Sequence, residues 1–374
     1  MRELRWLLRV APPFAALAAV VALGSASLRS TAMAAGCGGQ SLAAATRVAP
    51  PAPRAVAGAA AFVIAPLLDA SGTLAGQRVE VGTVGRVSAQ LELPAESFAA
   101  GPFGRAVLVG ADDGRSSTLR ALDATSGCSW LIATETDVIR RATIDPAAGN
   151  VYEFRVSRDA RADLGVWRRP LAGGPATQVL PPLSADDRFG PTFSTELSWS
   201  AEGDVLVAQS CGITSCRTRL LDAAGVRTFD GADQGEVIGL AGGRLIVYGA
   251  CRGLPCPVSS IDTTTGAATA IASAAGAARL VVTTTGPRLL AEVGLDADRA
   301  LVLVDPASAA RVSVPIDARD WHLVPNAARA GGALATAPGW ALLTRDGSPP
   351  GPGDAAELLD LENGTTLDLT EVTQ

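Results

Sequence analysis

The chain has 374 residues and a formal net charge of −6 at pH 7, and 48% of its residues are hydrophobic, which is enough apolar material for a large core. All 31 basic residues are Arg, and they are scattered without a basic run. A general affinity for DNA or RNA would require a clustered basic surface, so the composition argues against nucleic acid as a partner.

The first 36 residues are predicted to be an export signal. Arg2, Arg5 and Arg9 give a positive start, and an uncharged apolar stretch of 17 residues, APPFAALAAVVALGSAS, follows. Residues 32–34, Ala-Met-Ala, have the small-x-small pattern of a signal-peptidase site. An uncleaved anchor is the alternative, because an apolar stretch of this length reaches the short end of a membrane span.

Cys37 is a second candidate processing point. It follows Ala34, Ala35 and Gly36, a sequence that resembles a degenerate bacterial lipobox without the usual Leu. Cleavage there would leave Cys37 lipidated and would tether the chain to a membrane at its start. Residues 37–60 are rich in Ala, Pro and Gly and are predicted to form a flexible spacer. In either case we expect an exported chain that is extracellular, periplasmic or on the cell surface.

Residues 61–374 are predicted to form an all-β domain. Short apolar runs with alternating polarity are separated by clusters of Gly, Asp, Pro and Ser, which is the pattern of antiparallel strands and turns. No segment of this region has the pattern of an amphipathic helix. The clearest predicted strands lie in GRAVLVGADDG, GNVYEFRVSRD, GDVLVAQS, GRLIVYGA, PRLLAEVG and GWALLTRDG.

A recurring corner closes these strands: an apolar run, an Asp, and a Gly a few residues later. We expect the Asp side chain to accept hydrogen bonds from turn amides and the Gly to adopt a positive φ, so that the chain reverses. These Asp residues are therefore predicted to build turns and not to catalyse. The corners are LLDASG from Leu67, LRALDATSG from Leu119, LLDAAG from Leu220, SSIDTTTG from Ser259 and LLDLENG from Leu358, while LVLVDPASA from Leu301 lacks the Gly and RRPLAGG from Arg168 lacks the Asp.

The corners divide the domain into seven units, or six with a partial unit at the start, each of about 45 residues. This length fits a four-stranded blade, and blades arranged in a ring protect their edges. A solenoid would also repeat, but these units lack helices and a short fixed period. The sequence therefore predicts a β-propeller of four-stranded blades, seven or six in number.

One stretch, LSWSAEGDVLVAQS, resembles the blade motif of TolB-like and WD40-like propellers, in which Trp-Ser-Pro-Asp-Gly leads into an apolar strand. Trp199, Ser200 and Gly203 match this motif, whereas positions 201 and 202 carry Ala and Glu in place of the Pro and the Asp. The stretch ATIDPAAGNVYEFRV is a looser copy. The resemblance implies the propeller fold, export from the cytoplasm and a role through contacts with other proteins.

Four of the six cysteines form two pairs with equal internal spacing. Cys211 and Cys216 are followed, 40 residues later in each case, by Cys251 and Cys256. In each pair the first Cys ends a predicted strand and the second begins its hairpin partner. We therefore expect the disulfides Cys211–Cys216 and Cys251–Cys256, which suit an exported protein.

Two alternatives to these disulfides remain. Bridges between equivalent positions, Cys211–Cys251 and Cys216–Cys256, would have to span neighbouring blades that splay apart at their rims. A zinc site of four thiolates fits the C-x4-C spacing, but no His lies near either pair and the compartment oxidises thiols.

Cys37 and Cys128 leave two cases open. If Cys37 is lipidated, Cys128 is an unpaired thiol buried in a strand. If Cys37 is retained without a lipid, the two cysteines can join and fix the spacer to an early blade.

Catalytic motifs are sparse. His322 is the sole histidine, so a Ser-His-Asp arrangement would depend on it, and the chain contains no G-x-S-x-G or H-E-x-x-H motif. We expect His322, beside Trp321 in a loop, to be packed or solvent-facing. The acidic turn GADDG, with Asp112 and Asp113, lacks the ligand ladder of a calcium loop and is predicted to be a hairpin turn. No cofactor and no metal ligand are predicted.

Two functions are compatible with these observations. The first is an exported, non-catalytic binding or scaffolding propeller that contacts a protein or a cell-envelope ligand through the loops of one ring face. The alternative is an extracellular hydrolase or lactonase with axial carboxylates and with Ca²⁺ as a candidate metal, a chemistry that needs two carboxylates within about 5–10 Å. The candidate carboxylates are Glu196, Glu236 and Glu292, of which Glu292 is flanked by apolar residues on both sides.

Overall fold

The structure, a computed structural model, is an all-β fold. It describes residues 42, 60–83, 86–145, 149–159, 162–183, 194–212, 216–231, 234–249, 255–294, 298–314, 316, 320–324, 340–345, 347 and 356–368. Within these ranges, no helix is long and apolar enough to cross a membrane.

Six hydrogen-bonded sheets contain the strands of the described residues. The first sheet has three strands: β1 (Ala60–Leu68), β2 (Leu74–Thr83) and β3 (Arg86–Pro94). The second has β4 (Phe98–Phe103), β5 (Ala106–Asp112), β6 (Ser117–Asp123) and β7 (Ser129–Glu135). The third has β8 (Val138–Ile144), β9 (Asn150–Val156), β10 (Asp163–Pro170) and β11 (Thr177–Leu180). The fourth has β12 (Ser194–Trp199), β13 (Leu206–Cys211), β14 (Cys216–Asp222) and β15 (Gly225–Gly231).

The last two sheets complete the described strands. The fifth has seven strands: β16 (Gln234–Ala241), β17 (Arg244–Gly249), β18 (Cys256–Asp262), β19 (Ala268–Thr283), β20 (Gly286–Val293), β21 (Ala300–Val304) and β22 (Arg311–Ser313). The sixth has β23 (His322–Leu323), β24 (Trp340–Thr344), β25 (Ala356–Asp360) and β26 (Thr366–Asp368).

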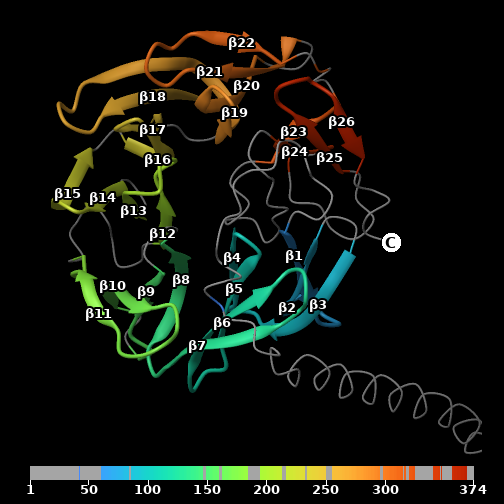
Figure 1. The fold of residues 1–374 in the computed structure, drawn as a ribbon, viewed down its shortest axis with the longest axis vertical. Helices are drawn as coiled ribbons and strands as arrows, with labels where there is room; N and C mark the ends of the chain where they lie inside the picture. Colours follow the sequence, from blue (N-terminus) through green and yellow to red (C-terminus); the bar gives the residue numbers. More distant parts are fainter. Residues whose placement is uncertain are drawn as a thin grey trace, which may run out of the picture.

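The sheets follow one another around a ring in chain order (Figure 1). Within each sheet the strands pair antiparallel and in chain order. In the four-stranded sheets the first strand lies innermost, and first strands of neighbouring sheets contact each other, as β4 does with β8 and β8 with β12. The predicted β-propeller fold is therefore confirmed.

Strand β19 joins two units of the ring into the fifth sheet. Its 16 residues pair with β18 as far as Ala275 and with β20 from Ala275 onward. The register shifts between Ala275 and Ala278, where the strand changes partner. Division of β19 at this point gives two four-stranded units, so the described strands make seven units, one of them with three strands.

The core of the ring consists of apolar clusters between neighbouring sheets. Side chains alternate between the two faces of a strand, so a sheet with neighbours on both sides needs apolar residues at successive positions. In β5, Val107 and Val109 pack with Val79 of the first sheet, whereas Leu108 packs with Ile139 of the third. The same division recurs at Leu206 and Val207 of β13 and at Leu289 and Leu290 of β20.

Leu42 belongs to one of these clusters although it falls in the range predicted as a spacer. It is 7% exposed and packs with residues of the second and third sheets. This point of the segment 37–60 is thus held against the body of the ring.

The predicted corners are confirmed in atomic detail. Asp262 Oδ1 accepts hydrogen bonds from the N–H groups of Thr264 and Thr265, each at 2.9 Å, and Gly266 has a φ of 73°. These hydrogen bonds lower the pKa of the Asp262 carboxyl. The corner without a Gly has the same geometry, because Ala309 occupies the equivalent position with a φ of 58°.

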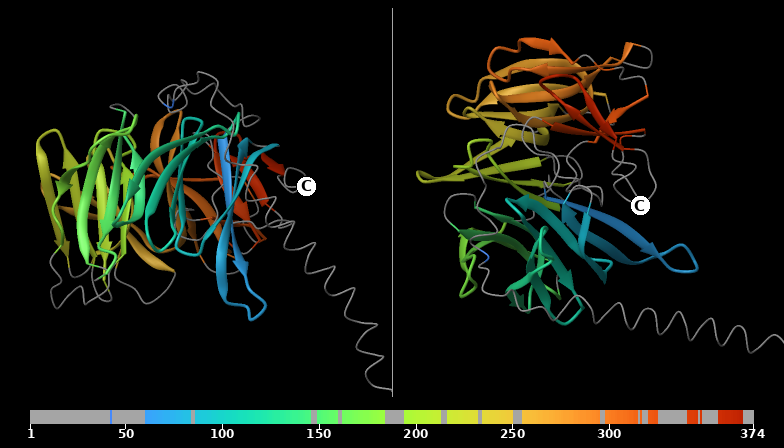
Figure 2. Two further views of the ribbon diagram at one scale, coloured as in Figure 1. Left: turned by 90° about the horizontal axis from the view of Figure 1, so that it is seen from below. Right: turned by 45° about the vertical axis from the view of Figure 1, so that its right-hand side comes forward.

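The alternating strand directions sort the turns onto two ring faces (Figure 2). We call one face the hairpin face; it carries the hairpins β5–β6, β9–β10, β13–β14, β17–β18 and β20–β21, and the links from each outer strand to the next inner strand. The opposite face, the corner face, carries the corners at Asp123, Asp222, Asp262, Asp305 and Asp360. Asp69 instead closes the hairpin between β1 and β2.

The two corner types provide a matched test of backbone strain. Ala309→Gly is expected to raise the free energy of unfolding by about 0.5–1 kcal/mol, because Gly adopts a positive φ without the steric penalty of a Cβ. Gly266→Ala is expected to lower it by about 1 kcal/mol. No atom lies within 4 Å of a Cβ built at Gly266, so this change acts through the backbone alone. Urea unfolding of both variants measures the effects, and shifts of the same sign would contradict the assignment.

Candidate functional site

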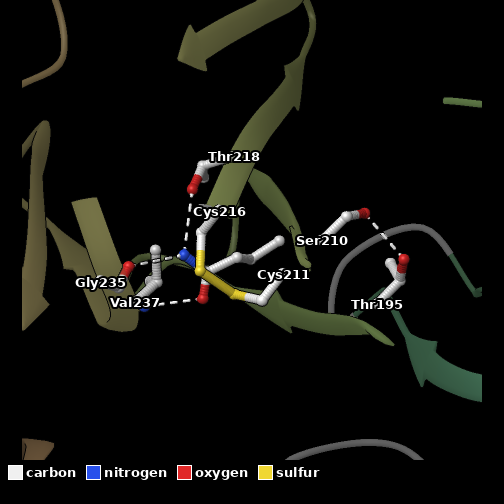
Figure 3. Close-up of a disulfide and its surroundings, with 8 residues drawn as sticks. Thr195, Ser210, Cys211, Cys216, Thr218, Gly235 and Val237 are labelled. Atoms are coloured by element: carbon white, nitrogen blue, oxygen red, sulfur yellow. Dashed lines mark hydrogen bonds between the residues drawn. A yellow bond between two sulfur atoms is a disulfide. The ribbon is translucent and has the colours of Figure 1, made fainter. Parts of the chain in front are cut away.

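The hairpin β13–β14 on the hairpin face is closed by a disulfide between Cys211 and Cys216 (Figure 3). The two residues lie directly opposite each other in the sheet register, with their Cα atoms 4.0 Å apart. Next to the bridge, the side chain of Gln209 donates to the carbonyl of Gly235 at 3.1 Å and accepts from the N–H of Val237 at 2.7 Å. The hairpin is therefore fixed both by a covalent bond and by hydrogen bonds to the first strand of the next sheet.

The other cysteines are also oxidised where the structure describes them. Cys128 and Cys256 are each disulfide-bonded, and the described residues include no free cysteine. Cys37 and Cys251 lie outside the described residues. The bonded state of Cys128 contradicts the case in which this residue is an unpaired thiol. For Cys211 and Cys216, the bridge between them rules out both alternatives: the inter-blade pairing and the zinc thiolates.

Removal of this bridge is expected to have a moderate effect. The double variant Cys211→Ser, Cys216→Ser should lose about 2 kcal/mol of unfolding free energy, because the bridge closes a short loop and restricts the unfolded chain only modestly. Denaturant unfolding under non-reducing conditions measures this loss. An unchanged midpoint would show that the hydrogen bonds of Gln209 alone fix the hairpin.

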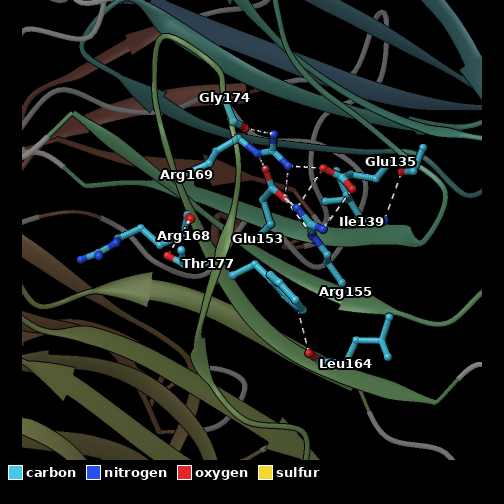
Figure 4. Close-up of polar contacts among 11 residues, drawn as sticks. Glu135, Ile139, Glu153, Arg155, Leu164, Arg168, Arg169, Gly174 and Thr177 are labelled. Atoms are coloured by element: carbon cyan, nitrogen blue, oxygen red, sulfur yellow. Dashed lines mark hydrogen bonds and ion pairs between the residues drawn. The ribbon is translucent and has the colours of Figure 1, made fainter.

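A buried ionic network joins the second and third sheets (Figure 4). Arg155 contacts Glu153 at 2.9 Å and Glu135 at 3.1 Å, and Arg169 is bonded to the same two carboxylates. Glu153 is fully buried, and Arg155 and Arg169 are each 5% exposed. The Arg155 guanidinium also lies 5.0 Å from the ring centre of Trp167. Two positive and two negative charges thus compensate each other inside the interface.

The sequence gives only a weak signal for this network. Glu153 and Arg155 occupy alternate positions of a predicted strand, so they share one face of it. Arg169 lies on the next strand and Glu135 on the preceding sheet, and no local pattern connects these positions. Burial opposes the charge of Arg169, but Glu153 and Glu135 outweigh it and raise the pKa of the guanidinium.

Asp112 and Asp113 build the predicted hairpin turn, and Asp112 has a second role. Asp113 Oδ1 accepts from the N–H groups of Arg115 and Ser116 at 2.8 and 2.7 Å. The Asp112 carboxylate binds the Arg158 guanidinium of the third sheet through two hydrogen bonds of 2.8 and 2.9 Å. Burial opposes ionisation of Asp112, but the hydrogen bonds from Arg158 and from the N–H of Gly114 outweigh it and lower the pKa of this carboxyl.

The Asp112–Arg158 pair predicts a pH dependence. Because the folded state lowers the pKa of Asp112, the pair contributes fully above the unfolded-state pKa of about 4 and is lost as the pH falls through the lower folded value. Asp112→Asn should lose about 2 kcal/mol of unfolding free energy at neutral pH, and the difference from wild type should shrink in acid. Urea unfolding at a series of pH values measures this. A difference that is constant with pH would contradict the ion pair, and Arg158→Met should reproduce the neutral-pH loss.

Glu292 and His322, which the sequence singled out separately, lie together on the hairpin face between the fifth and sixth sheets. Glu292 is 5% exposed, accepts a hydrogen bond from the N–H of Leu323, and has Oε2 3.5 Å from Nδ1 of His322. Nη1 of Arg299 lies 3.1 and 2.8 Å from the two ring nitrogens of His322. The imidazole is thus held between a carboxylate and a guanidinium, and His322 begins strand β23 where a loop was expected.

A partly buried tyrosine lies next to this pair. The Tyr248 hydroxyl donates to the carbonyl of Gly276 at 3.2 Å, and burial raises the pKa of Tyr248 to about 12. A Cβ at Gly276 would lie 3.2 Å from Oε2 of Glu292, so the glycine leaves room for the carboxylate. The side chain of His322 thus interacts with both Glu292 and Arg299.

The three candidate carboxylates lie on separate units of the ring. Glu196, on the inner strand β12, binds Arg141 of β8 at 2.8 Å. Glu236 is on the inner strand β16 and Glu292 on the second strand of the next unit. Among the described residues, no group of three or more His, Cys, Asp and Glu side chains is placed to hold a metal ion.

Comparison with known proteins identifies the fold but not the function. No protein-family model and no curated protein matches the chain. Among solved structures, a puromycin hydrolase shares 16% identity over 87% of this chain and 54% of its own, with a TM-score of 0.53. A prolyl endopeptidase shares 13% identity over 82% of this chain and 49% of its own, with a TM-score of 0.52. This chain therefore spans about half the length of these two proteins.

TolB from Acinetobacter baumannii is also among the similar structures, with 11% identity over 82% of this chain and 79% of its own and a TM-score of 0.44. At such identities, the likeness to the puromycin hydrolase and the prolyl endopeptidase shows a shared fold and leaves the activity open. The order of the sheets around the ring and this likeness together identify the chain as a β-propeller.

Proposed function

We propose that this protein is an exported, non-catalytic binding propeller that contacts a protein or a cell-envelope ligand through its hairpin face. The observation that carries the proposal is the construction of that face. The hairpin β13–β14 is closed by a disulfide and bonded to the next sheet through Gln209. The hairpin β5–β6 is held to the third sheet by the Asp112–Arg158 pair. A surface fixed before contact loses little conformational entropy on binding.

Export is supported by two independent features. The N-terminal 36 residues have the pattern of a secretion signal. Cys128, Cys211, Cys216 and Cys256 are disulfide-bonded, and disulfides persist in oxidising compartments outside the cytoplasm.

A binding role fits the state of the candidate carboxylates better than hydrolysis does. The carboxylate of Glu196 is occupied by Arg141, and that of Glu292 by the N–H of Leu323 and by His322. A glycosidase-type reaction requires two carboxylates that both face the scissile bond.

One observation favours the second candidate function, an extracellular hydrolase. A buried carboxylate beside a half-buried histidine is an arrangement that orients an imidazole for proton transfer. Against this role, Nη1 of Arg299 lies 2.8 Å from Nε2 of His322, so the nitrogen that would accept a proton is already covered.

Hydrogen–deuterium exchange tests the binding proposal. On addition of isolated cell-envelope material to the full-length protein, amides of the hairpins β5–β6 and β20–β21 should become protected, because a partner on the hairpin face excludes solvent there. The corners at Asp262 and Asp305 serve as internal controls and should keep their exchange rates. Protection confined to these corners would contradict the proposed binding face.

An activity screen separates the two functions. The purified protein is incubated with aryl esters, lactones and aryl glycosides, and we expect no turnover. Turnover that Glu292→Gln abolishes and Glu196→Gln leaves intact would instead establish a hydrolase centred on Glu292 and His322.

A further inference from the structure

Arg279 lies on the innermost strand of its unit. It belongs to the second half of β19, which contacts β16 and β23, the first strands of the units on either side. Figure 1 shows β19 on the inner side of its sheet, with β22 outermost. The residue is therefore placed near the centre of the ring.

The alternation of side chains along β19 shows on which face of the sheet the side chain of Arg279 lies. Ala277 and Val281, two positions before and after Arg279, pack in the apolar cluster between the fifth and sixth sheets. Leu290, the register partner of Arg279 on β20, packs in the same cluster. Arg279 thus leaves the sheet on the face toward the sixth sheet, among apolar neighbours.

Among the described residues, Arg279 differs from the other arginines of the inner strands in having no counter-ion. Arg141 binds Glu196 at 2.8 Å, and Arg140 binds Glu96 at 3.1 Å. In the part of the chain that the structure describes, no hydrogen bond and no ion pair involves the side chain of Arg279. No described side chain compensates its charge.

The surroundings make this charge unfavourable. Burial lowers the pKa of the Arg279 guanidinium, and no carboxylate in the described ranges raises it. The residue is nevertheless only half-buried, so solvent reaches it. A partly buried guanidinium with no partner among the described residues is unfavourable for the fold, and groups with perturbed ionisation are concentrated at binding sites.

We propose that Arg279 anchors a small oxyanion, a carboxylate or phosphate group, at the centre of the ring. The planar guanidinium presents parallel N–H donors that match two oxygens of either group. The apolar neighbours Ala277 and Val281 lower the polarity on the sheet side of the contact, which strengthens it. The site depends on the propeller fold and not on the partner of the hairpin face, so either proposal can fail without the other.

Thermal unfolding with inorganic phosphate and with acetate tests the site. The full-length protein is measured at constant ionic strength, with chloride as the reference anion. Binding to the folded state alone should raise the unfolding midpoint of the wild type by about 2 °C when the free anion is at roughly ten times its Kd. A larger rise with phosphate or with acetate identifies which oxyanion the site prefers.

Two variants of matched charge show whether Arg279 carries the effect. Arg279→Met should abolish the rise, whereas Arg288→Met, which removes an arginine paired with Asp305 in the same sheet, should retain it. Arg279→Lys should retain only part, because Lys lacks the planar pair of donors. No rise in the wild type, or an equal rise in Arg279→Met, would overturn the proposal.

Calorimetric titration keeps the test independent of stability. Phosphate added to folded Arg279→Met at 25 °C should release no heat beyond dilution, while wild type and Arg288→Met should both give a saturable signal. A saturable signal of equal affinity in Arg279→Met would overturn the proposal even if the variant unfolds at a different temperature.

Discussion

Each sheet inside this ring has to cover two apolar faces at once, and the rest of the structure depends on that constraint. A strand places successive side chains on opposite faces, so a sheet between two neighbours needs apolar residues at consecutive positions. The run Ala106–Val109 meets this need, with alternate residues assigned to the first and third sheets. The sheets stay together because neither face of a unit can be exposed without loss of buried apolar surface.

The same constraint governs the charged residues. A charge that enters an interface between sheets must be compensated there, because burial removes its hydration. Glu153, Arg155 and Arg169 satisfy this requirement with Glu135, and Asp112 satisfies it with Arg158. These pairs stabilise the relative position of the second and third sheets more specifically than apolar contacts do, since they require a defined register. Arg279 is the contrasting case, a charge in an interface for which the described part of the chain supplies no counter-ion.

The fold was predictable wherever local chemistry determines local shape. The corners illustrate this, because an Asp such as Asp262 and a Gly such as Gly266 impose the same reversal wherever they occur. The disulfide Cys211–Cys216 was predictable for a similar reason. The two cysteines are five positions apart, at the ends of two strands joined by a short hairpin loop, so the hairpin brings them together. The motif at Trp199 indicated the propeller fold because, in propeller blades, this motif forms the turn that leads into an apolar strand.

Other features were not predictable because they join positions that the sequence keeps apart. Glu292 and His322 meet across two units, and Glu135 meets Arg169 across two sheets. No short-range pattern records such contacts; they follow only from the order of sheets around the ring. Strand β19 escaped prediction for another reason. Its middle is a run of small residues, ASAAGAA, in which alternation between apolar and polar positions is too weak to read.

The continuous strand β19 also changes how the ring can come apart. Elsewhere, neighbouring units are held by side chains, and a separation can begin with a few lost contacts. Between β16 and β22 the backbone ladder passes through a shared strand, so these two units form a single mechanical block. Fraying of the circle should therefore begin at another seam, and this block should be the last portion to lose its hydrogen-bonded order.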